Sequence, residues 1–181
     1  MKPAVFLDRD GTLIEEKEYL HRIEQVRLLP GAVAGLQLLR RAGFKLFIVS
    51  NQSGVGRGYF TLADVELIHR HLAGVLAGEG VTFDRIYVAP EAPDLPSRGR
   101  KPSPQFLFDA RDELGLDLGQ SYMIGDKWID LQCGSNAGVK QSLLVRTGYG
   151  RKVERTERDI NARALVVDDL PSAAASILHG T

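Results

Sequence analysis

The chain has 181 residues and only one cysteine, Cys133. A single thiol cannot close an internal disulfide or supply a multi-cysteine zinc site, so a reducing cytoplasm is the expected setting. The longest apolar runs are of strand length, far below the roughly 20 residues that span a bilayer. The N-terminus also lacks the basic and apolar regions of a signal peptide. We therefore expect a cytoplasmic protein without membrane attachment.

An excess of charge of either sign is also absent, since 23 basic residues balance 23 acidic ones. Without a basic block or an acidic tail, the composition gives no reason to expect a nucleic-acid partner. The four histidines, His21, His69, His71 and His179, lack metal-ligand spacing, and we expect ordinary surface or helix positions for them. The length fits one domain over residues 1–181, and we expect a monomer.

Strand and helix signals alternate along the chain. Strands separated by helices require right-handed crossovers, which produce a parallel sheet with helices on both faces. We therefore predict the α/β class, with a Rossmann-like parallel sheet. The patterns place strands at 4–8, 44–50, 84–88, 121–124, 142–145 and 164–167, and helices at 32–42, 61–78, 104–114, 130–137 and 171–178.

Two aspartates lie at the end of the first predicted strand. The apolar residues 4–7 lead into Asp8 and Asp10, which are followed by Gly11 and Thr12. Positions i and i+2 of a strand point to the same side, so we expect both carboxylates at one place. Closely spaced carboxylates repel each other and provide the oxygen ligands that Mg²⁺ prefers. The motif therefore indicates a magnesium site, with a plain polar turn as the alternative.

Acidic residues also follow a later strand. In parallel α/β sheets, ligands bind beyond the carboxyl ends of the strands. Asp126 follows the fourth predicted strand and can reach the same cation as Asp8. Asp130 comes about one helical turn later and can support the metal ligands. The alternative for this second pair is an ordinary helix N-terminus, where the helix dipole favours aspartate.

A glycine-rich segment and a lysine complete the pattern. In residues 50–58, the Ser50 hydroxyl and successive backbone N–H groups can hold phosphate oxygens; a flexible strand-to-helix turn is the alternative. Lys101 precedes a predicted helix, where its ammonium can neutralise a phosphoryl group; a solvated basic turn is the alternative. An acid pair, a hydroxyl, a lysine and a second acid pair thus follow successive strands.

This order of residues resembles the haloacid dehalogenase superfamily of phosphotransferases over most of the chain. The resemblance implies that Asp8 attacks phosphorus and forms an aspartyl-phosphate. It implies that Asp10 is the general acid toward the leaving alkoxide and then the base toward water. Ser50 and Lys101 would hold the transferred phosphoryl group. Mg²⁺ would be held by Asp8, the backbone carbonyl of Asp10, and Asp126.

Four segments are similar to the histidinol-phosphate and heptose-bisphosphate phosphatase family: FLDRDGT at 6–12, VSNQSGVGRG at 49–58, RKPSP at 100–104 and YMIGDKWID at 122–130. The similarity implies that the substrate is a small phosphorylated sugar. The preferred candidate is a heptose bisphosphate on the route to ADP-heptose for lipopolysaccharide. Histidinol phosphate or another small sugar phosphate is the alternative. A silent phospho-ligand-binding module is a further alternative, disfavoured because the catalytic residues are all present. The similarity also implies substrate contacts from Arg9, Glu16, Lys17, Glu18, Tyr19, Asn51, Gln52, Ser53, Arg57, Arg100 and Lys127.

The segments between the motifs are too short for a separate cap domain, so we predict a capless core whose loops define the substrate. These loops are residues 15–21, 52–60 and 89–100. A bisphosphate carries a second phosphate away from the metal, and cationic side chains must meet it. The candidates are Lys17, Arg57, Arg98 and Arg100.

One segment departs from the family pattern. Many members carry a zinc site of three Cys and one His in the loop before the RKP sequence. Residues 89–99 contain neither Cys nor His, and a structural zinc site needs four ligands. We therefore predict no zinc, and we expect the prolines of this loop to stiffen it instead.

Overall fold

A computed structural model of the protein describes residues 1–180. It contains a six-stranded, all-parallel sheet in the order β3-β2-β1-β4-β5-β6. The predicted α/β class with a parallel sheet is confirmed. The strands are β1 (Ala4–Leu7), β2 (Lys45–Asn51), β3 (Arg85–Ala89), β4 (Tyr122–Gly125), β5 (Gln141–Val145) and β6 (Leu165–Val167).

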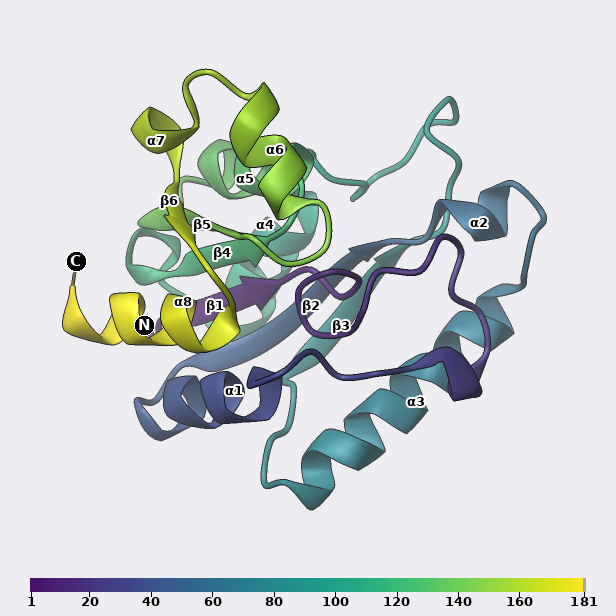
Figure 1. Ribbon diagram of the computed structural model, residues 1–181, viewed down its shortest axis with the longest axis horizontal. Coiled ribbons are helices and arrows are strands. Elements are labelled where there is room, and N and C mark those ends of the chain that lie inside the picture. The colour runs from purple at the N-terminus through teal and green to yellow at the C-terminus, as the bar shows by residue number, and fades with distance from the viewer. Residues whose placement is uncertain (181) are drawn as a thin grey trace.

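Helices cover both faces of the sheet (Figure 1). One face packs against α1 (Ala32–Arg41), α3 (Leu62–Gly78) and α8 (Leu170–His179). The other packs against α4 (Gln105–Leu114) and α5 (Trp128–Ala137). Short helices complete the chain: α2 (Ser53–Gly56), α6 (Gly150–Thr156), α7 (Ile160–Arg163), and the 3-10 turns η1 (Ile23–Gln25) and η2 (Leu118–Gln120).

The first strand shows why the sheet is buried on both sides. Val5 and Leu7 belong to the core under α1, α3 and α8, whereas Ala4 and Phe6 belong to the core under α4 and α5. All four side chains are fully buried, as expected for a central parallel strand. Because β1 lies between β2 and β4, the residues that follow it emerge in the middle of the sheet's carboxyl edge.

The start of α3 agrees with the sequence prediction. Thr61 and Asp64 form the predicted capping box of α3, in which each side chain accepts the other residue's backbone N–H. The sequence pattern places Ser103 at the N-cap of the next helix, but α4 begins at Gln105 and its N-cap residue is Pro104. The Ser103 hydroxyl instead donates to the carbonyl of Arg98, 3.1 Å away, and holds the preceding loop.

Three short helices were not predicted. Residues 53–56 were expected as a glycine-rich turn but form α2, and α6 and α7 precede β6. Their sequences are polar or glycine-rich and too short to show an apolar period. Among residues 1–180, no helix combines the length and apolar character that crossing a membrane would require.

Candidate active site

The ends of three strands bring a lysine and three carboxylates together in the interior. Asp8 follows β1, Asp126 follows β4, and Asp130 lies in the first turn of α5. Lys101 comes from the loop between β3 and α4. Its Nζ lies 2.6 Å from Asp8 Oδ1 and 2.6 Å from Asp130 Oδ1, and all four side chains are buried.

The charges in this cluster shift one another's pKa values. Burial lowers the pKa of Lys101, but Asp130 and Asp8 outweigh it, so the net pKa is raised and the ammonium persists. Burial raises the pKa of Asp8, but Lys101 and Lys127 bring it below its usual value. A charged carboxylate at Asp8 is the form in which an aspartate can act as a nucleophile.

The cluster has the donor set for a divalent cation. Asp8, Asp126 and Asp130 each offer a carboxylate oxygen, and these three atoms lie within 4.8 Å of one another. Burial raises the pKa of Asp126 to about 8, and the negative charges of Asp8 and Asp130 add to the effect. Buried carboxylates in this number require a positive charge, and hard oxygen donors fit Mg²⁺.

Asp126 has one oxygen left for such an ion. Its Oδ2 accepts the backbone N–H of Tyr149 at 2.8 Å. Within the described part of the chain, its buried Oδ1 has no hydrogen-bond partner, and the Lys127 ammonium lies 3.9 Å away. An orphaned, buried carboxylate oxygen costs free energy, which a bound cation would recover. The residues present therefore fit the predicted magnesium site.

Asp130 combines the two alternatives that the sequence left open. Its Oδ2 accepts the backbone N–H of Lys127 at 2.9 Å and so caps α5, while its other oxygen pairs with Lys101. The helix therefore starts at Trp128, two residues earlier than predicted.

Asp10 lies outside the three-carboxylate group. Its Oδ2 accepts from Arg9 Nε and from Gln52 Nε2, each at 3.0 Å, and its Oδ1 accepts from Arg9 Nη2 at 3.1 Å. The Asp8 and Asp10 carboxylates therefore have different partners, and Asp10 is not part of the group that Asp8 forms with Asp126 and Asp130. The strand ends at Leu7, so the alternation of strand side chains does not extend to Asp10.

Gln52 connects Asp10 to the predicted phosphate-binding hydroxyl. Its Nε2 also donates to Ser50 Oγ, 2.7 Å away. The side-chain amide of Asn51 binds the backbone of Lys101 twice. It donates to the Lys101 carbonyl at 3.0 Å and accepts from the Lys101 N–H at 2.9 Å. The end of β2 thus positions both the hydroxyl and the lysine.

A segment that the sequence left without a firm role holds Asp126. Thr147 Oγ1 donates to the carbonyl of Gly11 at 2.6 Å, and the Tyr149 N–H binds Asp126. A Cβ on Gly11 or on Gly148 would collide with the Asp126 carboxylate. Both glycines also have positive φ, 85° and 51°. The lack of space for a Cβ and the backbone conformation therefore both favour glycine at these positions.

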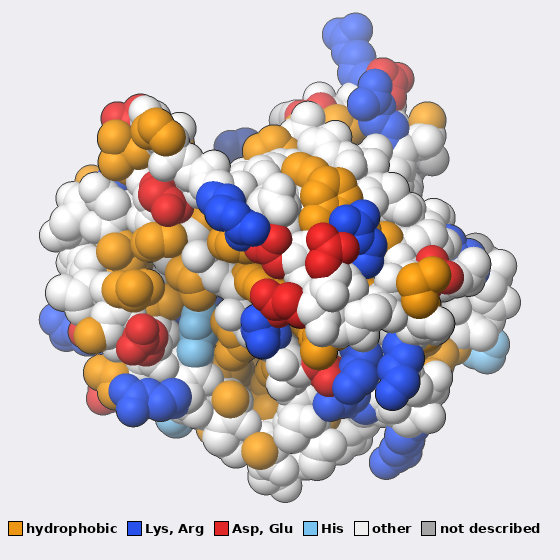
Figure 2. Space-filling view, turned by 180° about the vertical axis from the view of Figure 1, so that it is seen from behind, with side chains coloured by type: hydrophobic (Ala, Val, Ile, Leu, Met, Phe, Trp, Pro, Cys, Tyr) orange, Lys and Arg blue, Asp and Glu red, His pale blue; other side chains and the backbone are white. Residues whose placement is uncertain are grey.

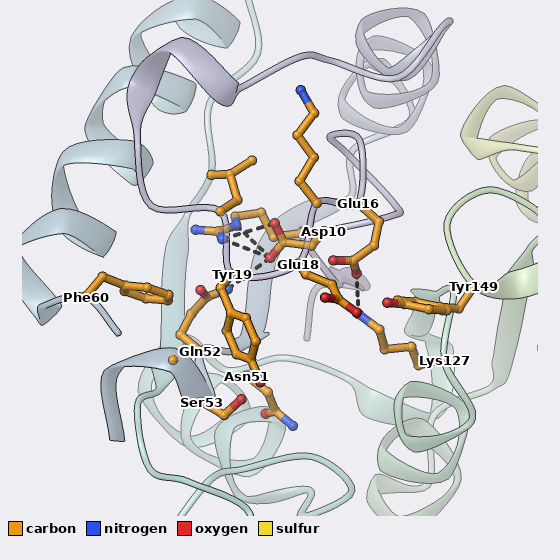
Figure 3. A pocket seen from close by; sticks show the side chains of 14 residues that line it. Asp10, Glu16, Glu18, Tyr19, Asn51, Gln52, Ser53, Phe60, Lys127 and Tyr149 are labelled. Atoms are coloured by element: carbon orange, nitrogen blue, oxygen red, sulfur yellow. Dashed lines mark hydrogen bonds and ion pairs between the residues drawn. The ribbon is translucent and has the colours of Figure 1, made fainter. Parts of the chain in front are cut away.

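A cavity of about 250 Å³ opens beside Asp10 (Figure 3). Figure 3 shows Phe60 on one side and Tyr149 on the other, with Tyr19 between them. Lys127 pairs with Glu16 at 2.7 Å and lies over the Tyr149 ring. The other polar lining residues are Arg9, Lys17, Glu18, Asn51, Gln52 and Ser53.

Two aromatic contacts hold the cavity wall together. The rings of Tyr19 and Tyr59 meet edge to face at 4.6 Å between centroids, and His21 stacks on Phe60 at 5.7 Å. Tyr19 has φ of 56°, an uncommon conformation for a residue with a Cβ. The loop after β1 is therefore fastened to the segment after β2.

The candidate cations for a second phosphate differ in their availability. Arg98 is paired with Asp109, and Lys17 donates to the carbonyl of Gln25 and pairs with Glu15. Burial lowers the pKa of Arg100, and the nearby charge of Arg57 lowers it further. Arg57 and Arg100 are therefore neighbours, although neither lines the cavity of Figure 3.

The parallel sheet and the carboxylate cluster at its carboxyl edge are the features of haloacid dehalogenase-like hydrolases. Comparisons with known proteins give the same class. The HAD-hydrolase-like family profile matches residues 99–173. A D-glycero-beta-D-manno-heptose-1,7-bisphosphate 7-phosphatase of Photorhabdus laumondii is 37% identical over 184 residues, covering 97% of this chain and 96% of that protein. The enzyme of the same name from Salmonella typhi is 39% identical over 181 residues, covering 94% of each chain.

A solved structure agrees over the whole length. The D,D-heptose 1,7-bisphosphate phosphatase of B. bronchiseptica, crystallised with magnesium and phosphate, superposes with a TM-score of 0.91 at 31% identity, covering 100% of both chains. The chain therefore belongs to the heptose-bisphosphate phosphatase family of the haloacid dehalogenase superfamily.

Proposed function

We propose that this chain is a Mg²⁺-dependent phosphatase that removes the 7-phosphate of D-glycero-D-manno-heptose 1,7-bisphosphate. The observation that carries the proposal is the buried cluster of Asp8, Lys101, Asp126 and Asp130. Residues close to it in the sequence, Arg9, Asp10 and Lys127, line a polar cavity. The substrate follows from the full-length similarity to phosphatases named for that sugar. The reaction would supply a step on the route to ADP-heptose for lipopolysaccharide.

In the first half-reaction, an Asp8 oxygen attacks phosphorus and the bond to the sugar oxygen breaks. Lys101 and Ser50 hold the phosphoryl oxygens, and Lys101 keeps Asp8 ionised. Bound Mg²⁺ would neutralise the negative charge that gathers there, held by Asp8, Asp126 and the backbone carbonyl of Asp10. Asp10 delivers a proton to the sugar oxygen as it leaves.

In the second half-reaction, Asp10 takes a proton from a water molecule, which attacks the phosphorus of the aspartyl-phosphate. The phosphorus–Asp8 bond breaks, inorganic phosphate leaves and the Asp8 carboxylate is restored. Asp10 has regained the proton it gave away, so the cycle is balanced. The hydrogen bonds from Arg9 and Gln52 hold Asp10 in place for both transfers.

The cavity suits a sugar. Glu16 and Glu18 offer acceptors for hydroxyl groups, and Tyr19, Phe60 and Tyr149 offer faces for C–H groups. Burial raises the pKa of Glu16, although Lys127 opposes the effect. Lys127, Asn51 and Ser53 complete the contacts, and Arg57 with Arg100 would meet the phosphate that is retained.

The remaining properties follow from the sequence. We propose a monomer in the cytoplasm, with residues 1–181 as one phosphatase domain and without zinc. In the structure the loop before Lys101 is braced by protein contacts: Ser97 Oγ donates to Glu91 at 2.6 Å, and Arg100 donates to the Glu91 carbonyl at 3.1 Å. On the face in Figure 2, acidic side chains lie between Lys and Arg side chains, which does not favour nucleic acid.

A phosphate-release panel tests the proposal. The purified enzyme is assayed with heptose 1,7-bisphosphate, fructose 1,6-bisphosphate and histidinol phosphate, each with Mg²⁺ and with a chelator. We expect the heptose bisphosphate to have the highest kcat/KM, chelation to abolish release, and Asp8→Asn to be inactive. A histidinol phosphate kcat/KM at least tenfold above that of the heptose would overturn the substrate, and full activity of Asp8→Asn would overturn the mechanism.

A further inference from the structure

One buried histidine contacts the catalytic segment although nothing in the sequence singled it out. His69 lies on α3, a helix position as expected, but it is only 7% exposed. Its Nε2 lies 3.1 Å from Nη1 of Arg9, across 60 residues of chain. Arg9 is 0% exposed, and it stands between Asp8 and Asp10 in the sequence.

The contact has a defined direction. A guanidinium carries only donors, so Nη1–H must donate and His69 Nε2 must accept. The ring proton therefore resides on Nδ1, and the imidazole is neutral. Burial, together with the charge of Arg9, lowers the pKa of His69 to about 3, so this form persists over the physiological range.

The other nitrogens of the same guanidinium are hydrogen-bonded to Asp10. Nε and Nη2 of Arg9 donate to the two carboxylate oxygens at 3.0 and 3.1 Å, and Gln52 donates to Oδ2. A carboxylate has about four acceptor sites, so three are occupied. The site left open is on Oδ1, and Asp10 is among the residues that line the cavity of Figure 3. In the proposed reaction, Oδ1 would therefore be the oxygen that exchanges a proton with substrate and water.

We propose that His69 is a positioning residue for Asp10, acting through the buried guanidinium of Arg9. Without an acceptor at His69, Nη1–H would be buried and unpaired, and the guanidinium would turn to find another partner. The guanidinium binds the Asp10 carboxylate through two hydrogen bonds that lie in one plane. If the guanidinium turned, the carboxylate would turn with it, and the open site on Oδ1 would move away from the leaving oxygen. This inference rests on the proposed phosphatase function.

The test compares His69→Leu, which removes the acceptor, with His69→Gln, whose amide oxygen can accept from Arg9. His71→Leu, on the same helix, is the matched control, because His71 makes no contact with the Asp10 system. Each variant is assayed with the sugar bisphosphate and, in a single turnover, with p-nitrophenyl phosphate. Nitrophenolate leaves without a proton, so its release does not need a well-placed acid.

We expect His69→Leu to lower kcat on the sugar substrate by about tenfold to a hundredfold, a part of what acid–base catalysis supplies, with KM within threefold. His69→Gln should retain at least a third of the activity, and nitrophenolate release should change less than threefold. Equal losses on both esters, or equal losses in the Gln and Leu variants, would overturn the proposal. Absence of turnover in the unaltered enzyme would instead overturn the proposed function.

A spectroscopic measurement on the unaltered protein covers the case in which His69→Leu does not fold. The side-chain ¹⁵N resonances of His69 should show a neutral ring with the proton on Nδ1, unchanged between pH 5 and pH 8. A ring protonated on Nε2, or an imidazolium within that range, would contradict the contact with Arg9 and with it the positioning role.

Discussion

Lys101 is the residue on which the charges of the site depend. It is the shared partner of Asp8 and Asp130, at 2.6 Å from each, and it is 2% exposed. Removing one member of a buried ionic group is costly because the remaining charges stay buried without compensation. Because we propose that the same ammonium holds the transferred phosphoryl group, its loss should affect both stability and turnover.

We expect Lys101→Met to lower kcat by at least a hundredfold and to destabilise the metal-free protein by about 3–5 kcal/mol. Lys152→Met on the exposed surface of α6 is the control and should leave both quantities unchanged. Phosphate release and urea unfolding measure the two effects. A variant that keeps its stability would show that Lys101 does not compensate Asp8 and Asp130.

His69 gives a pH dependence of stability with a definite sign. Its pKa is about 3 in the folded protein and about 6.5 when unfolded, so the unfolded state binds more protons between these values. Its contribution is therefore complete above pH 6.5 and is lost as the pH falls toward 3. From pH 7.5 to pH 5 the loss is about 2 kcal/mol.

The measurement is urea unfolding at pH 7.5 and at pH 5, for the natural protein and for His69→Gln. The glutamine variant should lose about 2 kcal/mol less over this range, because it has no imidazole to protonate. Parallel losses in the two proteins would mean that His69 already titrates normally in the folded state.

At the scale of elements, the turn from Thr147 to Tyr149 connects the end of β5 to the catalytic edge. It binds the backbone of Gly11 and one oxygen of Asp126, and leaves the other oxygen free for a cation. The turn lies 23 residues from Asp126 and 136 residues from Gly11 in the sequence. We therefore expect it to position Asp126 for the proposed magnesium site.

We expect Gly148→Ala to weaken Mg²⁺ binding at least tenfold, because the added Cβ would collide with the Asp126 carboxylate and with Gly11. Gly138→Ala is the matched control: Gly138 also has positive φ, 72°, but a Cβ there meets nothing within 4 Å. Both variants should lose about 1 kcal/mol of stability through backbone strain, but only Gly148→Ala should lose Mg²⁺ affinity in calorimetric titration. Equal affinities would remove the role assigned to the turn.

At the scale of the whole molecule, folding is linked to protons and to the metal. Burial raises the folded pKa of Asp126 to about 8 in the metal-free protein, far above its value of 3.8 in the unfolded chain. The folded state therefore holds a proton that the unfolded state releases. That contribution is complete below pH 3.8 and is lost as the pH rises through 8. Mg²⁺ would take the place of that proton.

We expect Mg²⁺ to raise the melting temperature more at pH 8 than at pH 6, because at pH 6 the proton on Asp126 competes with the ion. Thermal unfolding with and without Mg²⁺ at the two pH values measures the effect. Asp126→Asn imitates the protonated acid, so its melting temperature should respond little to Mg²⁺ at either pH. A strong response of this variant would place the ion elsewhere.

The sequence by itself determined the alternation of strands and helices, the parallel sheet, and the placement of Asp8, Ser50 and Asp126 at the ends of strands, because these depend on short-range periodicity and on one rule for parallel sheets. The tertiary structure alone decided where the Asp10 carboxylate points, that His69 reaches Arg9, and that Tyr149 holds Asp126. Such contacts join distant parts of the chain, so no local pattern records them. The first motif therefore predicted the chemistry that we propose, and the packing around it decided which groups hold the Asp10 carboxylate.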